Sequence, residues 1–302
     1  MANVIPAALK RDVILNNAMR QFKRRILPVM AFATAFRNVP LQGTNKILVP
    51  YFPLDSSAST DFSGTYVIGN TSEVQTKEVT VNKRKYQSLS FTSDEWNRQP
   101  FLDIEKIVMM KVEKLAADIL GDIFSVITAA NYAGTTIPAV AASAFDLDEV
   151  LALRRICNES DWTEVGRSLI LDSGHVENLL KDARLGNQNA GSTAPVRDGR
   201  FGGRIAGFEP VEVPNLPDNG EKLVGMALIP SAMAVAFSPI QPAPAVRAAL
   251  QEYSIVTDPD SGLSLEYRVW GDPDTDKQKE VIECNYGYEK LETAALKRIV
   301  EP

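Results

Sequence analysis

The sequence contains one stretch whose glycine spacing could cradle a phosphate group, GRFGGRIAGF at residues 199–208. A P-loop has the pattern GxxxxGK[ST], in which the lysine reaches the phosphates and the hydroxyl binds magnesium. Gly202 and Gly207 have this spacing, but Phe208 and Glu209 occupy the positions of the lysine and the hydroxyl. No GxGxxG fingerprint opens a helix here either. We therefore predict that the glycines form a turn or flexible loop; they are Gly199, Gly202, Gly203 and Gly207.

A second candidate is the only histidine of the chain, His175, which follows Asp172 and Ser173. An aspartate, a serine and a histidine could form a hydrolytic triad, with the serine as nucleophile and the histidine as base. Residues this close on one turn cannot readily adopt that geometry, and no GxSxG elbow is present. A helix N-cap followed by a first-turn histidine accounts for the same residues. A hydrolase that uses Ser173 and His175 is therefore a remote alternative.

Two further groups have residue types that bind metals. Four acidic residues have the spacing of a calcium loop, namely Asp272, Asp274, Asp276 and Glu283. Lys277 stands where such a loop needs glycine, and strand-like segments rather than helices flank it. Cys157 and Cys284 have no CxxC partner, so the sequence suggests neither a zinc site nor a disulfide framework. The absence of a disulfide framework fits a protein of the reducing cytosol. We predict no metal site, no cofactor and no enzymatic activity.

Composition and charge indicate a globular protein with a polarised chain. The 302 residues are 45% hydrophobic and 23% charged, which permits a sizeable core, and no apolar run approaches the roughly 20 residues that cross a bilayer. Residues 1–40 carry seven basic side chains and one acidic one, although the whole chain has a net charge of −6. The basic N-terminal segment is expected to meet an acidic partner protein, another copy of the chain or nucleic acid. The acidic body argues against broad DNA binding.

Two segments are predicted to be extended arms. Residues 7–28 have apolar side chains at helical spacing and end at Pro28, which predicts a detachable amphipathic helix. Residues 43–92 contain two strand-like runs around a loop of small residues, which predicts a two-stranded arm. The second run is polar on both faces in its middle, so we expect its supporting surface on another copy; an ordinary exposed hairpin is the alternative. Contacts between copies are predicted at Phe22, Arg24, Arg25, Lys83, Arg84, Lys85, Arg200 and Arg204.

The remaining pattern predicts a long helix followed by a mixed α/β region. Apolar residues recur every three or four positions after Pro100 for about 30 residues, a rod of about 45 Å, in which Lys114 can pair with Asp118. A helix is expected over residues 146–158, then a buried strand over 168–171 and a capped helix that ends by Gly186. Three further strands are expected near the C-terminal end of the chain.

Two passages carry a resemblance to a known family. They are SFTSDEWNRQPFLDIEKIVMMKVEKLAADIL at residues 90–120, and LILDSGHVENLLKDARLGNQ with GGRIAGFEPVEVPNLP at residues 169–188 and 202–217. The first resembles the entry into the spine helix of the major capsid proteins of tailed bacteriophages, the Hong Kong 97-like fold family that encapsulin shells share. The second is similar to that family's strand, capped helix and glycine-containing turn. The likeness covers nearly the whole chain and depends on the order and spacing of elements.

The resemblance implies an α+β fold, a Hong Kong 97-like capsid fold divided into named parts. These would be an N-arm (1–40), an extended β-hairpin E-loop (41–98), a P-domain with the spine helix (99–146), a mixed α/β A-domain (147–255) and returning P-domain strands (256–302).

The resemblance also implies a structural protein that self-assembles into hexamers and pentamers of an icosahedral shell around double-stranded phage DNA. Assembly would occur in the host bacterial cytoplasm and the product would be the virion capsid. The implied partners are further copies, a portal, a decoration protein and DNA bound without sequence specificity, with no membrane. Because the arm starts almost at Met1, we expect a separate scaffolding protein. An encapsulin-type nanocompartment shell protein is the alternative, although the 40-residue arm counts against it. No partner asparagine or catalytic glutamate matches the family's cross-links, so none is predicted.

Overall fold

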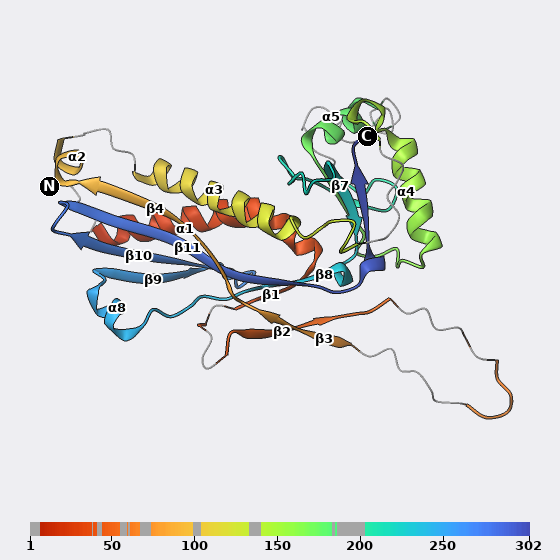
Figure 1. Cartoon of the computed structure of the whole chain (residues 1–302), viewed down its shortest axis with the longest axis horizontal. Coiled ribbons are helices and arrows are strands. Elements are labelled where there is room, and N and C mark those ends of the chain that lie inside the picture. Colours follow the sequence, from red (N-terminus) through yellow and green to blue (C-terminus); the bar gives the residue numbers. More distant parts are fainter. Residues whose placement is uncertain are drawn as a thin grey trace.

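The computed structural model describes residues 7–37, 39–40, 44–54, 59, 61–66, 74–98, 104–132, 140–182, 185 and 203–302. A long sheet carries two helices along one face, and a four-stranded sheet with two further helices lies at one end (Figure 1). A two-stranded hairpin leaves the long sheet on the side away from the helices. The fold is therefore mixed helix and sheet.

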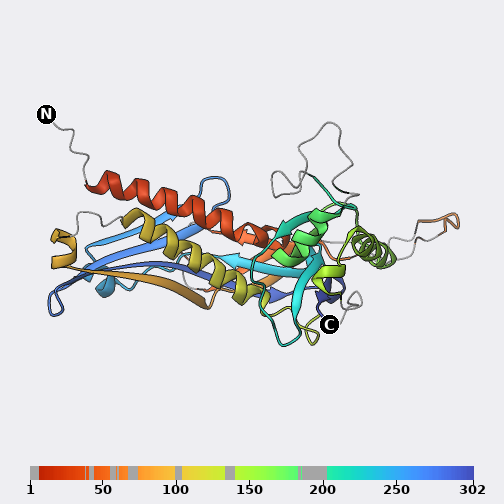
Figure 2. The same ribbon diagram turned by 90° about the horizontal axis from the view of Figure 1, so that it is seen from above.

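The two helices on the long sheet are α1 (Ala7–Ile26) and α3 (Ile104–Phe124), which lie side by side (Figure 2). Apolar residues at three- and four-residue spacing give each helix a buried stripe. The predicted pair of Lys114 and Asp118 is present on α3 at 2.8 Å. The buried stripes consist of Leu15, Ala18, Met19, Phe22 and Ile26 on α1, and of Val108, Val112, Leu115, Ile119 and Ile123 on α3.

The long sheet is organised around its 14-residue strand, β11. Its order is β1, β8, β11, β10, β9, and β4 pairs with the other edge of β11. Every pairing is antiparallel except that of β1 with β8. The strands are β1 (Ala33–Phe36), β4 (Lys83–Thr92), β8 (Met233–Phe237), β9 (Glu252–Thr257), β10 (Ser264–Asp272) and β11 (Lys277–Lys290).

The register of these strands separates two faces of the long sheet. Phe36, Phe237 and Tyr286 stand opposite one another across three strands and belong to the main core with α1 and α3. Because side chains alternate along a strand, the intervening rows point to the other face. That face carries small residues at one end and charged residues at the other.

The four-stranded sheet has the order β12, β7, β5, β6. Two helices flank it, and each begins at an aspartate that caps it: Asp146 accepts a hydrogen bond from the Asp148 N–H at 2.7 Å, and Asp172 accepts one from the His175 N–H at 3.0 Å. The predicted cap at Asp172 is confirmed. The elements are α4 (Leu147–Glu159), β5 (Ser168–Leu171), α5 (Ser173–Lys181), β6 (Glu209–Glu212), β7 (Leu223–Leu228) and β12 (Leu296–Val300).

The projecting hairpin consists of β2 (Lys46–Tyr51) and β3 (Gln75–Thr80). The remaining short elements are α2 (Ser93–Arg98), α8 (Pro244–Ala249) and four 3-10 helices, η1 (Leu27–Ala31), η2 (Ala142–Ala144), η3 (Pro230–Ala232) and η4 (Thr293–Ala295).

The prediction that the N-terminal helix is detachable is wrong. Its apolar stripe lies in the same core as α3 and the long sheet, and Phe22 is fully buried there. The helix is also tied to the body by polar contacts, since Asn17 donates to Glu105 at 3.0 Å and Lys23 lies 2.8 Å from Asp258. An amphipathic stripe shows that a face needs cover, and here the cover comes from the same chain.

Two further expectations differ from the structure. The long helix has 21 described residues and ends at Phe124, where Asn219 donates to the Phe124 carbonyl at 3.0 Å and thereby satisfies a carbonyl that the helix end leaves free. The second strand-like run of the predicted arm is two strands, β3 and β4. β4 pairs with β11 over ten residues, so its supporting surface lies in the same chain and not on another copy.

Sheet pairing also crosses the predicted boundary at residue 255. β8 lies within the span 147–255 but belongs to the long sheet, β9 of the same sheet runs across residue 255, and β12 lies within 256–302 but pairs with β7. The apolar run from Leu223 to Phe237 supplies one strand to each sheet. Pro230 separates the two strands in a short 3-10 helix.

Candidate functional site

The hairpin carries a group of exposed apolar side chains. Phe62 and Tyr66 are 64% and 83% exposed, and their ring centroids lie 4.9 Å apart. Exposed apolar groups that cluster on a projecting element are typical of an interaction surface, because burying them against a partner is favourable. We refer to the five exposed residues as the arm surface: Leu48, Phe52, Phe62, Tyr66 and Val74.

These five residues were not predicted from the sequence. The sequence predicts the segment around Phe62 and Tyr66 only as a loop of small residues. One feature of the sequence could have indicated this exposed pair: two aromatic residues stand in a stretch rich in Ser, Thr, Asp and Gly, and neither a strand period nor a helix period accounts for them.

The predicted contact residue Lys83 is engaged within its own chain. Its ammonium lies 3.1 Å from Asp122 on α3, hydrogen-bonds the Tyr288 hydroxyl and stands over the Tyr288 ring at 4.3 Å from the centroid. Partial burial opposes the charge, but the bonds with Tyr288 and Asp122 raise the pKa of Lys83 above its usual value. Lys85 likewise donates to the Asp118 carbonyl at 2.6 Å. Both lysines therefore fasten β4 to α3.

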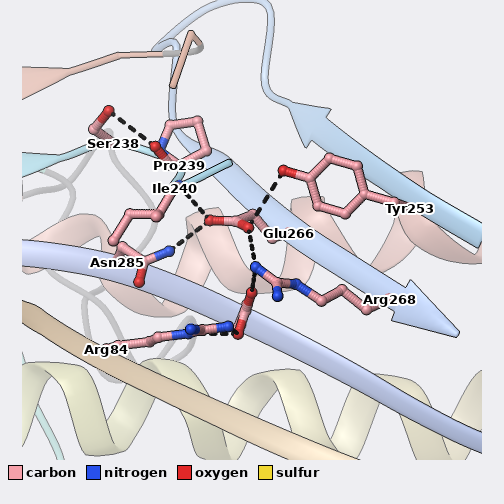
Figure 3. A network of polar contacts seen from close by, with 9 residues as sticks. Arg84, Ser238, Pro239, Ile240, Tyr253, Glu266, Arg268 and Asn285 are labelled. Carbon is pink, nitrogen blue, oxygen red and sulfur yellow. Dashed lines mark hydrogen bonds and ion pairs between the residues drawn. The ribbon is translucent and has the colours of Figure 1, made fainter. Parts of the chain in front are cut away.

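The third basic residue, Arg84, points to the opposite face of β4 and joins a buried charged network (Figure 3). Its Nε donates to Glu283 at 2.7 Å. Glu283 on β11 stands opposite Glu266 on β10, and both are 1% exposed. Arg268 lies between the two carboxylates, 3.0 Å from Glu266 and 2.5 Å from Glu283. Two arginines thus balance two carboxylates.

Glu266 also holds the connection that follows β8. It accepts hydrogen bonds from the Ile240 N–H at 2.6 Å and the Asn285 amide at 2.5 Å (Figure 3). Burial raises the pKa of Glu266, although the bonds from Ile240 and Arg268 work against that shift. Because the carboxylates are bound by side chains of the same chain, the network ties β4, β10 and β11 together, and we assign it a structural role. Leaving one charge of such a network unpaired typically costs about 3–5 kcal/mol.

The predicted contact residues on α1 differ in exposure. Phe22 is in the core and is not available to another copy, whereas Arg24 is exposed and Arg25 is half-buried. Both arginines line an open groove of about 610 Å³ between the end of α1 and β6. Glu113, Glu209 and Glu212 line the same groove, so charges of both signs face it.

The free edge of β6 is protected against strand addition. The N–H groups of Glu209 and Val213 point to β5, since they donate to the carbonyls of Arg167 and Leu171 at 2.9 Å. The alternate residues face outward, and two of them, Pro210 and Pro214, have no N–H to offer. Contacts at this edge must therefore use side chains.

Part of the glycine-rich stretch lies within the described residues. Ile205 and Phe208 exchange hydrogen bonds of 2.9 and 2.8 Å, and both residues between them, Ala206 and Gly207, have positive φ, which defines a tight hairpin turn. A turn was predicted for Gly207. Gly203 and Arg204 are exposed. The other predicted residues, Gly199, Arg200 and Gly202, lie outside the described residues.

Ser173 and His175 do not contact each other as nucleophile and base. The Ser173 hydroxyl donates to Glu212 at 2.6 Å, whereas the fully buried His175 ring contacts Asp172 at 2.6 Å through Nδ1 and the Val140 carbonyl at 3.2 Å through Nε2. Burial works against a charged ring, but these two acceptors raise the pKa of His175. The arrangement ties α5 to the segment before α4.

Three of the acidic residues with the spacing of a calcium loop contact other side chains of the chain. Asp272 pairs with Lys279 at 2.5 Å, Asp276 accepts from Ser93 at 2.6 Å, and Glu283 belongs to the buried network. Among the residues that the structure describes, no group of three or more His, Cys, Asp or Glu side chains could hold a metal ion. Within the same residues, no helix combines the length and the apolar character needed to cross a bilayer.

No family model matches the chain, and no curated protein matches its sequence. Solved structures do match it over most of its length. The capsid structure of cyanophage P-SCSP1u has 13% identity and a TM-score of 0.54, covering 90% of this chain and 86% of that one. A chain from Mycobacterium phage Che8 has 16% identity and a TM-score of 0.55, covering 85% of each chain. The mature capsid of bacteriophage PhiM1 has 11% identity and a TM-score of 0.53, covering 89% and 85%. At these identities the likeness establishes the fold, which is that of phage capsid structures.

Proposed function

We propose that this chain is the structural subunit of a capsid shell and does no chemistry. The observation that carries the proposal is the exposed arm surface on a hairpin that projects from a body with a phage capsid fold. An isolated two-stranded hairpin is marginally stable in water, and its exposed aromatic pair adds an unfavourable contact with solvent. A neighbouring copy that covers the arm surface would remove both costs.

Repetition by symmetry turns such a modest contact into a stable assembly. The same arm would dock on the next copy around a ring, so each subunit gives one arm contact and receives one. We propose hexamers and pentamers in an icosahedral shell, as the family resemblance implies. The exposed Arg24 and Arg204 are proposed as rim contacts, where charges steer association more than they stabilise it.

Double-stranded DNA is the proposed content of the shell. The net charge of −6 disfavours tight binding to phosphates, which suits a container in which DNA must move during packaging. A portal, a separate scaffolding protein and a decoration protein are the proposed partners, with assembly in the bacterial cytoplasm and the virion capsid as the final location.

Electron microscopy of the purified chain, alone and with its scaffolding protein, tests the proposal. Rings, tubes or shells are expected from the wild type. The double variant Phe62→Ser and Tyr66→Ser should lose them while its monomer keeps its melting temperature, since both side chains are exposed. The matched control is Phe62→Tyr with Tyr66→Phe, which keeps both rings and should assemble.

A wild type that remains monomeric under all of these conditions would refute the shell proposal. Nuclease-protected DNA inside particles from infected cells supports DNA as the content. Particles filled with an enzyme and free of DNA would contradict that part and favour a nanocompartment shell.

A further inference from the structure

The backbone of the hairpin approaches that of the long sheet closely at Gly287 of β11. A Cβ atom added at Gly287 would lie 2.0 Å from the Thr80 carbonyl oxygen and 2.7 Å from the Thr80 carbonyl carbon. Real Cβ atoms do not approach other atoms closer than about 3.0 Å. The atoms in the way are backbone atoms at the end of β3, so no side-chain rotation can make room. Gly287 has no positive φ, and the close approach is therefore what requires glycine here.

The neighbours of Gly287 are small as well. Ala236 stands opposite Gly287 on β8, and Ala35 stands opposite Ala236 on β1. Together with Ala33 and Ala234 in the next row, they form the floor on which the hairpin rests. We refer to these five residues as the arm seat.

Apolar residues of the hairpin fill the space above the arm seat. Ile47, Val49, Val79 and Val81 are at most 2% exposed and form a small core with the alanines of the seat, separate from the main core. Beyond this core, Lys77 on β3 lies 3.8 Å from Glu289 on β11, an exposed pair that contributes little. Backbone proximity at Gly287 and the small apolar core thus fix the arm to the sheet.

We propose that Gly287 is a positioning residue for the arm: its missing side chain sets the height and direction at which the hairpin leaves the sheet. A methyl group at this position must push Thr80 away by about 1 Å or more, from 2.0 Å to at least 3.0 Å. A rotation of the hairpin about this contact moves the tip farther than the base, because the strands extend about 3.3 Å per residue beyond the contact. The consequence for assembly rests on the proposed function, whereas the direction of the arm does not.

A distance measurement on the monomer tests the direction of the arm. Spin labels at Ser63→Cys on the arm and Arg20→Cys on α1 report it, since both positions are exposed and the two native thiols, Cys157 and Cys284, are buried. Gly287→Ala should shift the mean distance by about 3 Å or more, given the amplification along the strands. The control is Gly271→Ala on β10, where the added Cβ meets only the flexible Gln251 amide at 3.0 Å.

A second variant covers the case in which Gly287→Ala does not fold. Ala236→Val adds two methyl groups to the same seat, and it should shift the distance in the same direction by less. Unchanged distances in folded Gly287→Ala, or in Ala236→Val if the first variant is unfolded, would overturn the proposal.

The assembly readout separates this inference from the proposed function. If the wild type assembles, Gly287→Ala should reduce the yield of particles at least tenfold relative to Gly271→Ala. If the wild type fails to assemble but the label distance still shifts, the shell proposal fails and the positioning role of Gly287 stands. A shifted distance with undiminished particle yield would overturn the part that links the seat to assembly.

Discussion

The N-terminal helix α1 and the β2–β3 hairpin are both elements that the sequence predicted to be extended arms. The structure places them in opposite situations. The apolar stripe of α1 is buried against α3 and the long sheet, whereas the hairpin buries one face of its strands and leaves the arm surface exposed. The comparison shows that an amphipathic pattern specifies that a face must be covered but not which copy covers it.

Polar contacts strengthen the contrast. Lys23 joins α1 to the turn after β9 through Asp258 at 2.8 Å and Asp260 at 3.2 Å. The ion pairs of the hairpin are exposed, as in the pair of Lys46 and Glu78, which joins two strands of the hairpin itself. One part-buried hydrogen bond, from the Leu54 N–H just after β2 to Glu292 at 2.9 Å, also ties this segment to the body. We infer that α1 belongs to the folding unit and that the hairpin is free to serve assembly.

The largest expected effect is that of Phe22→Ala on α1. Removing a fully buried phenyl ring leaves a cavity in the main core and should lower the free energy of unfolding of the monomer by about 3–5 kcal/mol. Phe62→Ala on the hairpin is the matched variant. Because Phe62 is exposed, this variant should change the free energy of unfolding of the monomer by no more than about 0.5 kcal/mol. Urea denaturation followed by circular dichroism measures both. Equal losses for the two variants would remove the distinction between the elements.

Local features of the fold could be predicted from the sequence because they depend on neighbouring residues. The strand β5 and its Asp172 cap, the helix α4, and the pair of Lys114 and Asp118 all follow from hydrophobic periodicity and from contacts within four residues. The tight turn at Gly207 follows from the same kind of local constraint.

Pairings between distant segments could not be predicted in this way. β4 has a polar middle that suits an exposed strand, but Lys83 and Arg84 meet acidic partners 39 and 199 residues away. The period of a strand gives no information about such partners, because pairing depends on topology. The same limitation explains why β7 and β8 could not be assigned to different sheets.

The candidate site was predicted only in part. Exposed Arg24 and Arg204 remain predicted contacts, whereas Phe22 is in the core and Lys83 and Lys85 bind α3. Phe62 and Tyr66 were missed since hydrophobic residues in a loop have no period. Their exposure on a projecting element becomes visible only in three dimensions.

A smaller effect is expected from the charged anchor of α1. Burial would raise the pKa of Asp258, but hydrogen bonds from Lys23 and Ser261 lower it to about 2, from a usual value of 3.8. The contribution of Asp258 to stability is thus fully present above about pH 4 and is lost as the pH falls through about 2. We expect Asp258→Asn to lower the melting temperature at pH 6 by a few degrees, and this effect should shrink as the pH falls and be lost below about pH 2. Thermal unfolding followed across this pH range measures the difference.

The wild type and Asp258→Asn should therefore converge as the solution becomes acidic. A constant difference between the two proteins at all pH values would mean that the anchor acts by packing and not by charge. In that case the apolar stripe of α1 would still hold the helix on the body. Its ion pair with Asp258 would no longer distinguish α1 from the hairpin.

The smallest effect is expected from Lys46→Ala on the hairpin. The side chains of Lys46 and Glu78 are 54% and 47% exposed, and water and salt screen a pair of this kind. The variant should lose no more than about 0.5 kcal/mol of monomer stability, and the loss should vanish in high salt. Urea denaturation at low and high salt measures it, with Lys46→Arg as the control that keeps the charge. A loss as large as that of Phe22→Ala would contradict this expectation, because an ion pair that water and salt screen cannot contribute several kcal/mol.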